Sequence, residues 1–280
     1  MNLAENLLKI CMENKIEDTL RTSENWEEMY HLSSMRQNLL EWYEFRKEAS
    51  LLEVGSEAGA LTGFFSKVVK SVVSLEADAQ MAEVNKERNT KCSNVEIRVG
   101  GFEQVLNEKF DYITLIGTIE YAFKYDSSNS SKSNPFQGLL SMCKEHLKEN
   151  GVLILALDNK TGMKYWAGAP EHCTGTPYAG ITNERDANSP RTFSKDEIEA
   201  MLDEAGLSRR EFYYPTPDYR FVSSMYSDEY LPQAGELRPG NMVYKEGGYQ
   251  FFEEDLAYDT VCRDGKYPYF AESFLIFAEK

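Results

Sequence analysis

Apolar and polar positions in the middle of the chain follow a repeating order of short apolar runs and amphipathic stretches. The apolar runs predict five strands, at residues 50–55, 70–78, 94–100, 110–117 and 151–159. The stretches between them predict helices at 59–69, 79–89 and 134–150. Because strands that alternate with helices build βαβ units, we expect an α/β fold with a mostly parallel sheet and helices on both faces.

The first 47 residues follow a helical pattern instead. Apolar residues recur at helical spacing from Ala4 to about Leu20, and a second helix is expected from Leu32 to Phe45. We therefore expect residues 1–47 to form a helical cap in front of the alternating region.

The alternation stops after residue 159. Residues 160–192 are rich in Gly, Pro and aromatic residues, and a loop of this length usually covers a site. A helix with a capping box is predicted over 194–207, and two further strands over 209–215 and 272–280. The Tyr- and Pro-rich segment between these two strands is expected to build a lid, although an interaction surface is an alternative.

The charge of the chain argues against a nucleic-acid partner. Its 46 acidic and 30 basic residues give a formal net charge of −16, whereas a polyanion requires a basic surface. No apolar run in the sequence reaches the roughly 20 residues that span a bilayer, and the acidic N-terminal segment does not resemble a secretory signal. We expect a cytoplasmic protein that does not enter a membrane.

The sequence gives no sign of a metal site. Its five cysteines are scattered and form no C-x-x-C pair, so we expect reduced structural thiols rather than zinc ligands. His, Asp and Glu residues do not cluster at ligand spacing either. No metal is therefore predicted.

The segment LLEVGSEAGALTG, residues 51–63, places three glycines directly after the first strand of the alternating region. A glycine turn between the first strand and its helix is the usual position of a ligand crevice in an open parallel sheet. Glycine also lets a ligand come close to the backbone. For Gly63, packing of the helix on the strand is the alternative role.

The acids around this loop indicate the chemistry of the ligand. The spacing is G-x-x-x-G rather than the G-x-G-x-x-G of dinucleotide sites, and Glu57 inside the loop would repel a pyrophosphate. Glu53, at the end of the first strand, suits a cationic amino group. Glu76, at the end of the second strand, can accept both hydroxyls of a ribose. The expected ligand is a nucleoside that carries an amine and no phosphate.

These segments resemble the motifs of class I S-adenosylmethionine-dependent methyltransferases over about residues 30–210. LLEVGSEAGALTG and VVSLEAD are similar to the glycine loop and ribose acid of that family, FDYITLIGTIEYA to its fourth-strand motif, and LKENGVLILALDN to its fifth strand. The resemblance implies S-adenosylmethionine as donor and S-adenosylhomocysteine as product. It implies donor contacts from Glu53, Gly55, Ser56, Gly59, Glu76, Ala77, Gly101, Phe102 and Gly117.

Two parts of this implied donor site have alternatives or departures. The family often has Asp or Asn at the position of Gly101, so the backbone amide and Phe102 would have to contact the adenine. In the cap, Tyr30 or His31 would touch the donor and Arg36 would pair with its carboxylate through a bidentate fork. The alternative for Arg36 is a solvated helix face.

The resemblance also implies the architecture. We expect a Rossmann-like, seven-stranded, mostly parallel sheet in which the two late strands supply the antiparallel edge. The expected parts are a helical cap over 1–47, a donor-binding core over 48–214 that includes loop 160–192, and a lid with a terminal edge strand over 215–280.

A narrower resemblance rests on LDNKTGMKYWAGAPEHCTG, RTFSKDEIEAMLDEAGL and SDEYLP. These segments are similar to bacterial methyltransferases tied to surface-polysaccharide or glycosyl-transfer pathways. That group more usually has E-N-R where this chain has Asp158, Asn159 and Lys160.

Several side chains near the carboxyl ends of the strands are candidates for the chemistry. A histidine of neutral pKa or a carboxylate can remove a proton from an acceptor, which makes His172, Glu120 and Asp158 the catalytic candidates. For His172, a hydrogen bond that orders the loop is the alternative. Tyr121, Asn159, Tyr165 and Trp166 are expected to bind the acceptor, with packing as the alternative for Trp166.

The sequence thus predicts a methyltransferase that acts on a hydroxyl or amine of a small-molecule or glycan-type acceptor. Two other functions stay open. One is an NAD-type oxidoreductase, for which Glu76 fits but the glycine spacing does not. The other is a non-catalytic partner subunit with the same fold, against which the retained acids argue. A homodimer is compatible with either function.

Overall fold

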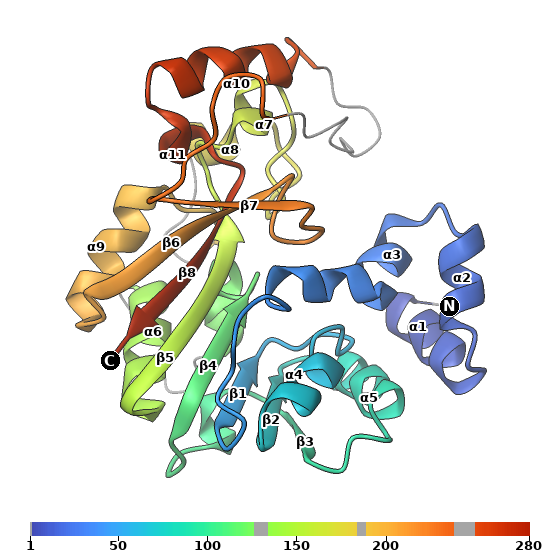
Figure 1. Cartoon of the computed structure of the whole chain (residues 1–280). Coiled ribbons are helices and arrows are strands. Elements are labelled where there is room, and N and C mark those ends of the chain that lie inside the picture. The colour runs from blue at the N-terminus through green and yellow to red at the C-terminus, as the bar shows by residue number, and fades with distance from the viewer. Residues whose placement is uncertain (1, 126–133, 184–188, 238–249) are drawn as a thin grey trace.

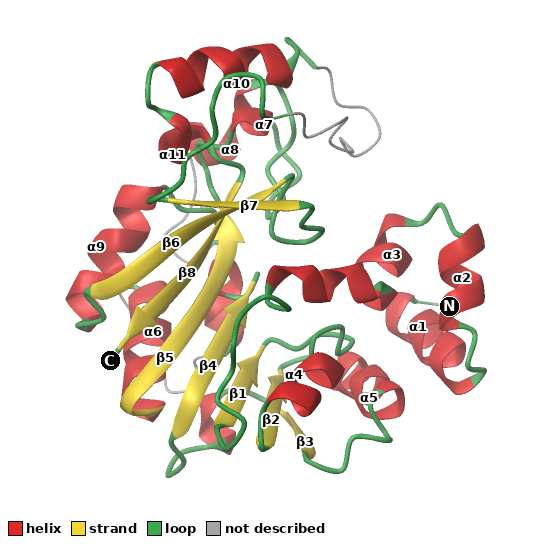
Figure 2. Ribbon diagram, in the orientation of Figure 1, coloured by secondary structure: helices red, strands yellow, loops and turns green. Residues whose placement is uncertain are grey.

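The computed structural model describes residues 2–125, 134–183, 189–237 and 250–280. Its centre is one sheet of eight strands in the order β3-β2-β1-β4-β5-β8-β6-β7 (Figures 1 and 2). The first five strands pair in parallel; they are β1 Ser50–Val54, β2 Ser71–Glu76, β3 Val95–Val99, β4 Phe110–Ile116 and β5 Leu147–Asp158. Chain order reverses between β1 and β4, where an open α/β sheet forms its ligand crevice.

The last three strands correct the predicted sheet. β8 (Ser273–Glu279) lies between β5 and β6 (Arg209–Thr216) and is antiparallel to both, so the terminal strand is interior rather than an edge strand. Its residues are buried on both faces, as expected for an interior strand. The edge is an eighth strand, β7 (Ser224–Ser227), which the sequence did not predict because four residues with two serines carry no apolar run.

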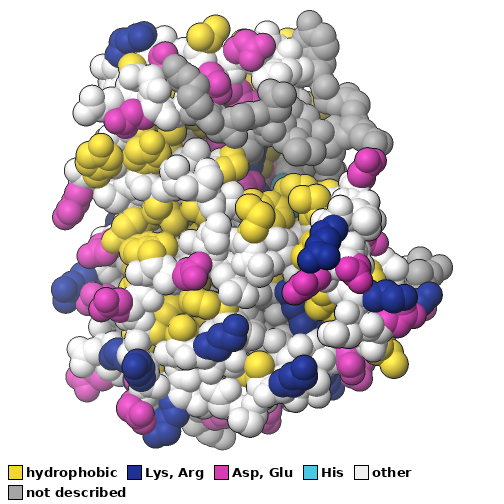
Figure 3. Space-filling view, turned by 45° about the vertical axis from the view of Figure 1, so that its right-hand side comes forward, with side chains coloured by type: hydrophobic (Ala, Val, Ile, Leu, Met, Phe, Trp, Pro, Cys, Tyr) yellow, Lys and Arg dark blue, Asp and Glu magenta, His cyan; other side chains and the backbone are white. Residues whose placement is uncertain are grey.

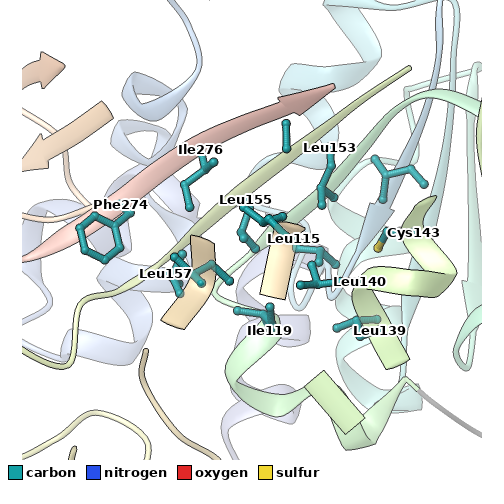
Figure 4. Packing of buried hydrophobic residues seen from close by; sticks show 14 of the residues in the cluster. Leu115, Ile119, Leu139, Leu140, Cys143, Leu153, Leu155, Leu157, Phe274 and Ile276 are labelled. Atoms are coloured by element: carbon teal, nitrogen blue, oxygen red, sulfur yellow. The ribbon is translucent and has the colours of Figure 1, made fainter. Parts of the chain in front are cut away.

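Helices cover both faces of the sheet, as predicted. α4 (Thr62–Val68) packs in one apolar cluster with β1, and α5 (Ala79–Arg88) follows β2. α6 (Pro135–His146) and α9 (Lys195–Ala205) pack on the other face. Figure 4 shows Leu139, Leu140 and Cys143 of α6 against leucines of β4 and β5. This packing fixes the strand ends that carry the candidate site.

The N-terminal cap is more broken than predicted. It consists of α1 (Leu3–Met12), α2 (Ile16–Thr22), α3 (Trp26–Leu32) and the short 3-10 helix η1 (Ser34–Leu39). Asn14 has a φ of 54° and interrupts the first predicted helix, while Ser33 ends α3 and caps η1. Leu7 and Leu32 share an apolar cluster with Ala58. The cap therefore rests directly on the glycine loop.

The segments after β5 form short helices beyond the carboxyl ends of the strands (Figure 1). They are α7 (Met163–Trp166) and α8 (Ala179–Thr182) from the predicted loop, and α10 (Glu254–Arg263) and α11 (Tyr267–Phe270) from the predicted lid. Residues 184–188 of the loop and 238–249 of the lid lie outside the described residues. None of the helices in the described ranges combines the length and the apolar character needed to cross a bilayer.

Candidate active site

The glycine loop follows β1 and adopts the backbone geometry that favours glycine. Gly55 has a φ of 77° and Gly59 a φ of 71°. A Cβ on Gly55 would lie 2.6 Å from the Thr118 hydroxyl, and one on Gly59 would collide with Asn85. A Cβ on Gly63 would meet Asn89 of α5, which supports the packing alternative for Gly63.

Glu53 ends β1 in a buried network of neutral polar side chains. Its Oε2 accepts hydrogen bonds from Thr62 (2.6 Å) and Ser74 (3.1 Å). The Asn85 side-chain amide donates to Ser56, Thr62 and Ser74 at 3.0–3.3 Å, which ties the loop to β2 and α5. Burial raises the pKa of Glu53 to about 7, although the two hydrogen bonds and the nearby Arg36 lower it. Glu53 is therefore poised to ionise when a cationic group arrives.

A pocket opens beside this network. Its volume is about 340 Å³, including space open to solvent. Its walls include the predicted residues His31, Arg36, Glu53, Gly55 and Ser56. The structure thus brings together residues from the cap and from the glycine loop, as predicted.

Glu76 ends β2 beside the glycine loop. Its Oε2 accepts the Glu57 amide hydrogen at 2.6 Å, and its Oε1 accepts that of Asp78 at 2.9 Å. Each oxygen keeps one further lone pair, so the fixed carboxylate can still accept two hydroxyls. Burial raises the pKa of Glu76. Ala77 packs against the main apolar core and has no polar role.

The cap contributes a buried cation. The Arg36 guanidinium lies 4.0 Å from the centre of the Tyr30 ring and donates to the Tyr30 carbonyl at 3.4 Å. Its Nε is buried without a partner. His31 lies 3.7 Å from Glu57 and 3.8 Å from Glu27, and burial lowers the pKa of its imidazole. Arg36 is buried, so the solvated-face alternative for it is wrong.

The groups of Gly101 and Phe102 that were predicted to contact the adenine make hydrogen bonds and packing contacts within the chain. The Gly101 amide donates to Glu103 at 2.7 Å, and the Phe102 amide donates to the Tyr125 carbonyl at 3.5 Å. The Phe102 side chain belongs to the buried core. These groups are engaged within the chain, because the short 3-10 helix η2 (Phe102–Gln104) folds this segment against Tyr125.

Asp158, at the end of β5, is the centre of a second buried network. Arg220 binds both of its carboxylate oxygens, at 3.1 and 2.5 Å, and Lys164 binds one at 2.7 Å. Arg220 also donates to Asp218 at 2.9 Å. Burial alone would raise the pKa of Asp158, but the two cations outweigh it and hold the pKa well below its usual range. Asp158 is therefore a structural anion rather than the predicted base.

Glu120 lies beside this network in the 3-10 helix η3 (Ile119–Lys124). Its Oε1 accepts the Asp158 amide hydrogen at 3.2 Å, and its Oε2 is buried without a partner. Burial, followed by the negative charge of Asp158, raises the pKa of Glu120 to about 8. A proton acceptor with a pKa near neutral is suited to catalysis.

The remaining candidates, the four predicted acceptor-binding residues and His172, differ in their burial and in their hydrogen bonds. The side chain of Tyr165 is buried, and its hydroxyl has no partner. The Tyr121 hydroxyl lies close to the Cys173 thiol, and His172, next to Cys173 in the chain, is exposed. Asn159 needs correction, because its amide makes hydrogen bonds to Tyr269, Ala271 and Thr161 that use all its donors. Trp166 is 38% exposed and donates to the Thr161 carbonyl at 3.2 Å, which fits its packing alternative.

Sequence reasoning missed Lys164, Tyr219 and Arg220. The Tyr219 hydroxyl lies 2.6 Å from the position that a Cβ on Gly117 would take, and Gly117 has a φ of 70°. The absence of a side chain at Gly117 therefore leaves space for the Tyr219 hydroxyl. An arginine within the aromatic segment DYRFV was the available signal, but its partner Asp158 is 62 residues away.

Two findings concern other kinds of partner. In the described part of the chain, no group of three or more His, Cys, Asp or Glu side chains could hold a metal ion. Among the described residues on the face drawn in Figure 3, Lys and Arg are interspersed with Asp and Glu.

Comparisons with known proteins agree with the fold. A SAM-dependent methyltransferase from Archaeoglobus fulgidus is similar over 96% of this chain and 99% of its own, with 13% identity and a TM-score of 0.52. A chain of the complex between the Haloferax volcanii Trm112 methyltransferase activator and a methyltransferase is similar over 98% and 96%, with 12% identity and a TM-score of 0.52. At such low identity these likenesses establish the fold alone, and no curated protein matches. A family model described as methyltransferase domain matches residues 26–211, and the chain therefore belongs to that family.

Proposed function

We propose that this protein transfers a methyl group from S-adenosylmethionine to a hydroxyl or amine of a small-molecule or glycan-type acceptor. The observation that carries the proposal is the set of buried polar groups around one pocket. Glu53 of β1, Glu76 of β2 and Arg36 of the cap lie around the glycine loop. The two acids would repel a phosphate group.

The residues present fit the donor group by group. Arg36 has a buried, unpartnered Nε for a carboxylate, Glu53 can ionise for an ammonium group, and Glu76 has free lone pairs for the ribose hydroxyls. The sulfonium of the bound donor supplies a methyl group that is already activated. The role of the chain is to orient donor and acceptor and to exclude water.

Glu120 is the proposed proton acceptor. Its free oxygen is buried, and the neighbouring Thr118 hydroxyl donates to the Val54 carbonyl at 2.8 Å, which places η3 against the glycine loop. Asp158 positions Glu120 through a backbone amide and does not itself take a proton.

Calorimetric titration of the purified protein with S-adenosylmethionine, S-adenosylhomocysteine and NAD tests the proposal. We expect both adenosyl ligands to bind and NAD not to bind. Glu76→Ala should weaken adenosyl binding by roughly 10- to 100-fold, because two hydroxyls lose a buried charged acceptor. Glu83→Ala, an exposed position on α5, is the matched control and should bind as the natural protein does.

Each contrary result points elsewhere. Binding of NAD instead of the adenosyl ligands would favour an oxidoreductase. Binding of none of the three would favour the non-catalytic partner subunit. Unchanged affinity in Glu76→Ala would remove Glu76 from the ribose site while leaving the donor in place.

A further inference from the structure

We propose, on the basis of the function proposed above, that the acceptor is a cationic amine whose ammonium group binds the free carboxylate oxygen of Glu120. This narrows the acceptor from a hydroxyl or amine to an amine. The proposal rests on the charge balance of the buried groups at the carboxyl ends of β4 and β5.

Four charged side chains in this region already neutralise one another. Asp158 contacts Arg220 and Lys164, and Asp218 contacts Arg220 at 2.9 Å and Lys164 at 4.0 Å. Two carboxylates thus share two cations, and all four side chains are buried. Nothing in this set is left over to compensate another charge.

Glu120 lies beside this set, as Glu254 and Glu272 lie beside Lys164, and it is a carboxyl group that no cation of the set is left to balance when it ionises. Its side chain is only 2% exposed, one oxygen accepts the Asp158 amide, and the other has no partner. Tyr165, 3% exposed, leaves its hydroxyl unpartnered, and Arg220, also 3% exposed, leaves its Nε unpartnered. Buried polar atoms are normally paired, so the unpartnered oxygens of Glu120 and Tyr165 are open to a donor from a ligand, whereas the Arg220 Nε–H is itself a donor.

The sign of the missing charge decides the class of ligand. An anionic ligand would add a third negative charge beside Asp158 and Asp218. A neutral hydroxyl would give one hydrogen bond but would leave an ionised Glu120 uncompensated. An ammonium group beside the carboxylate would compensate its charge, and it offers three donors. A cation is the ligand group that balances the site.

The same contact prepares the nitrogen for reaction. The ammonium gives one proton to the Glu120 carboxylate and becomes a neutral amine with a free lone pair. That lone pair forms the new N–C bond to the donor methyl as the C–S bond breaks, and the bonding electrons of C–S remain on sulfur. The products are a methylammonium ion, S-adenosylhomocysteine and a protonated Glu120.

Infrared difference spectroscopy of the protein saturated with S-adenosylhomocysteine tests the proposal at pH 7. The carbonyl band of protonated Glu120 is assigned as the band lost in Glu120→Gln. Ethylammonium chloride, ethanol and sodium acetate are the probes, because they carry the same two carbons with a cation, a hydroxyl or an anion. We expect ethylammonium to remove most of the Glu120 band and the other two probes to leave it in place.

Two variants serve as controls. Glu254→Gln removes a different buried glutamate with unpartnered oxygens, and it should keep the full response to ethylammonium. Glu120→Asp keeps a carboxyl group and should restore part of the response. Calorimetric binding of S-adenosylhomocysteine to each variant reports whether its donor site is folded.

The outcomes separate this proposal from the function on which it rests. Failure of the natural protein to bind S-adenosylhomocysteine would overturn the proposed function. Binding of S-adenosylhomocysteine with a Glu120 band that ethylammonium does not change would overturn the amine acceptor alone. The same conclusion would follow if ethanol removed the band equally, or if no protonated Glu120 band were present.

Discussion

At the residue scale, the donor pocket depends on an acid that is not ionised by default. Burial raises the pKa of Glu53 to about 7, and its hydrogen bonds come from neutral hydroxyls rather than from cations. A donor ammonium group binds the ionised form better, so binding and deprotonation of Glu53 are linked.

This linkage predicts a pH dependence of donor affinity. Below pH 7 the carboxyl must lose a proton before it can bind the ammonium, so affinity should rise with pH and level off above about 7. Between pH 5.5 and 7 we expect a gain of roughly tenfold, given that one pKa unit corresponds to 1.36 kcal/mol. Calorimetry with S-adenosylhomocysteine at a series of pH values measures it. Glu53→Gln should flatten the profile, and an equally steep profile in that variant would contradict the assignment.

Gly55 offers a second prediction at this scale. Gly55→Ala should destabilise the fold by about 1–3 kcal/mol, because it adds a side chain at a φ of 77° and places a Cβ 2.6 Å from the Thr118 hydroxyl. Gly175→Ala is the matched control, since Gly175 has a φ of 69° and nothing within 4 Å of its Cβ position. Denaturant unfolding of both variants isolates the steric contribution. Equal losses would mean that the contact with Thr118 has no cost.

At the element scale, the sequence was informative where an element carries its own pattern. The apolar runs predicted β1 to β5, and the capping box at Ser194 and Glu197 predicted the start of α9. β7 was missed because it has no apolar run and is held only by pairing with β6. The Arg220 network was missed for a related reason. Its partners lie on β5, α7 and the β6–β7 connection, and only the tertiary fold brings them together.

This network should stabilise the packing of β5, α7 and the β6–β7 connection against one another. Asp158→Asn should destabilise the protein by about 3–5 kcal/mol, because it leaves the buried charges of Arg220 and Lys164 without compensation. A double-mutant cycle of Asp158→Asn with Arg220→Met, followed by denaturant unfolding, measures the coupling. The same cycle on the surface pair Asp203 and Arg210 is the control and should give a much smaller coupling. A coupling at Asp158 no larger than that control would contradict the role of the network.

At the scale of the whole molecule, four buried glutamates lie on β1, on η3, on α10 and directly before β8. Burial raises the pKa of Glu53 and Glu254 to about 7 and that of Glu120 and Glu272 to about 8. The fold therefore keeps four carboxyl groups protonated at a pH where the unfolded chain ionises them. Buried carboxyl groups of this kind reduce the stability of the folded chain. Strongly perturbed pKa values are typical of functional sites.

These four groups predict that stability falls as pH rises from about 5 to 7. In this range the unfolded state has released its carboxyl protons and the folded state has not, so the free energy of unfolding decreases with pH by up to about 1.4 kcal/mol per unit for each group. Above about 8 the folded groups also ionise and the slope vanishes. His31, whose pKa burial lowers, acts in the opposite direction, but it is one group against four.

Urea unfolding at several pH values measures the slope, and Glu254→Gln should reduce it by the contribution of one group. A stability that stays level or increases between pH 5 and 7 would show that these carboxyl groups are ionised in the folded protein, and the protonated Glu120 band on which the infrared test depends would then be absent.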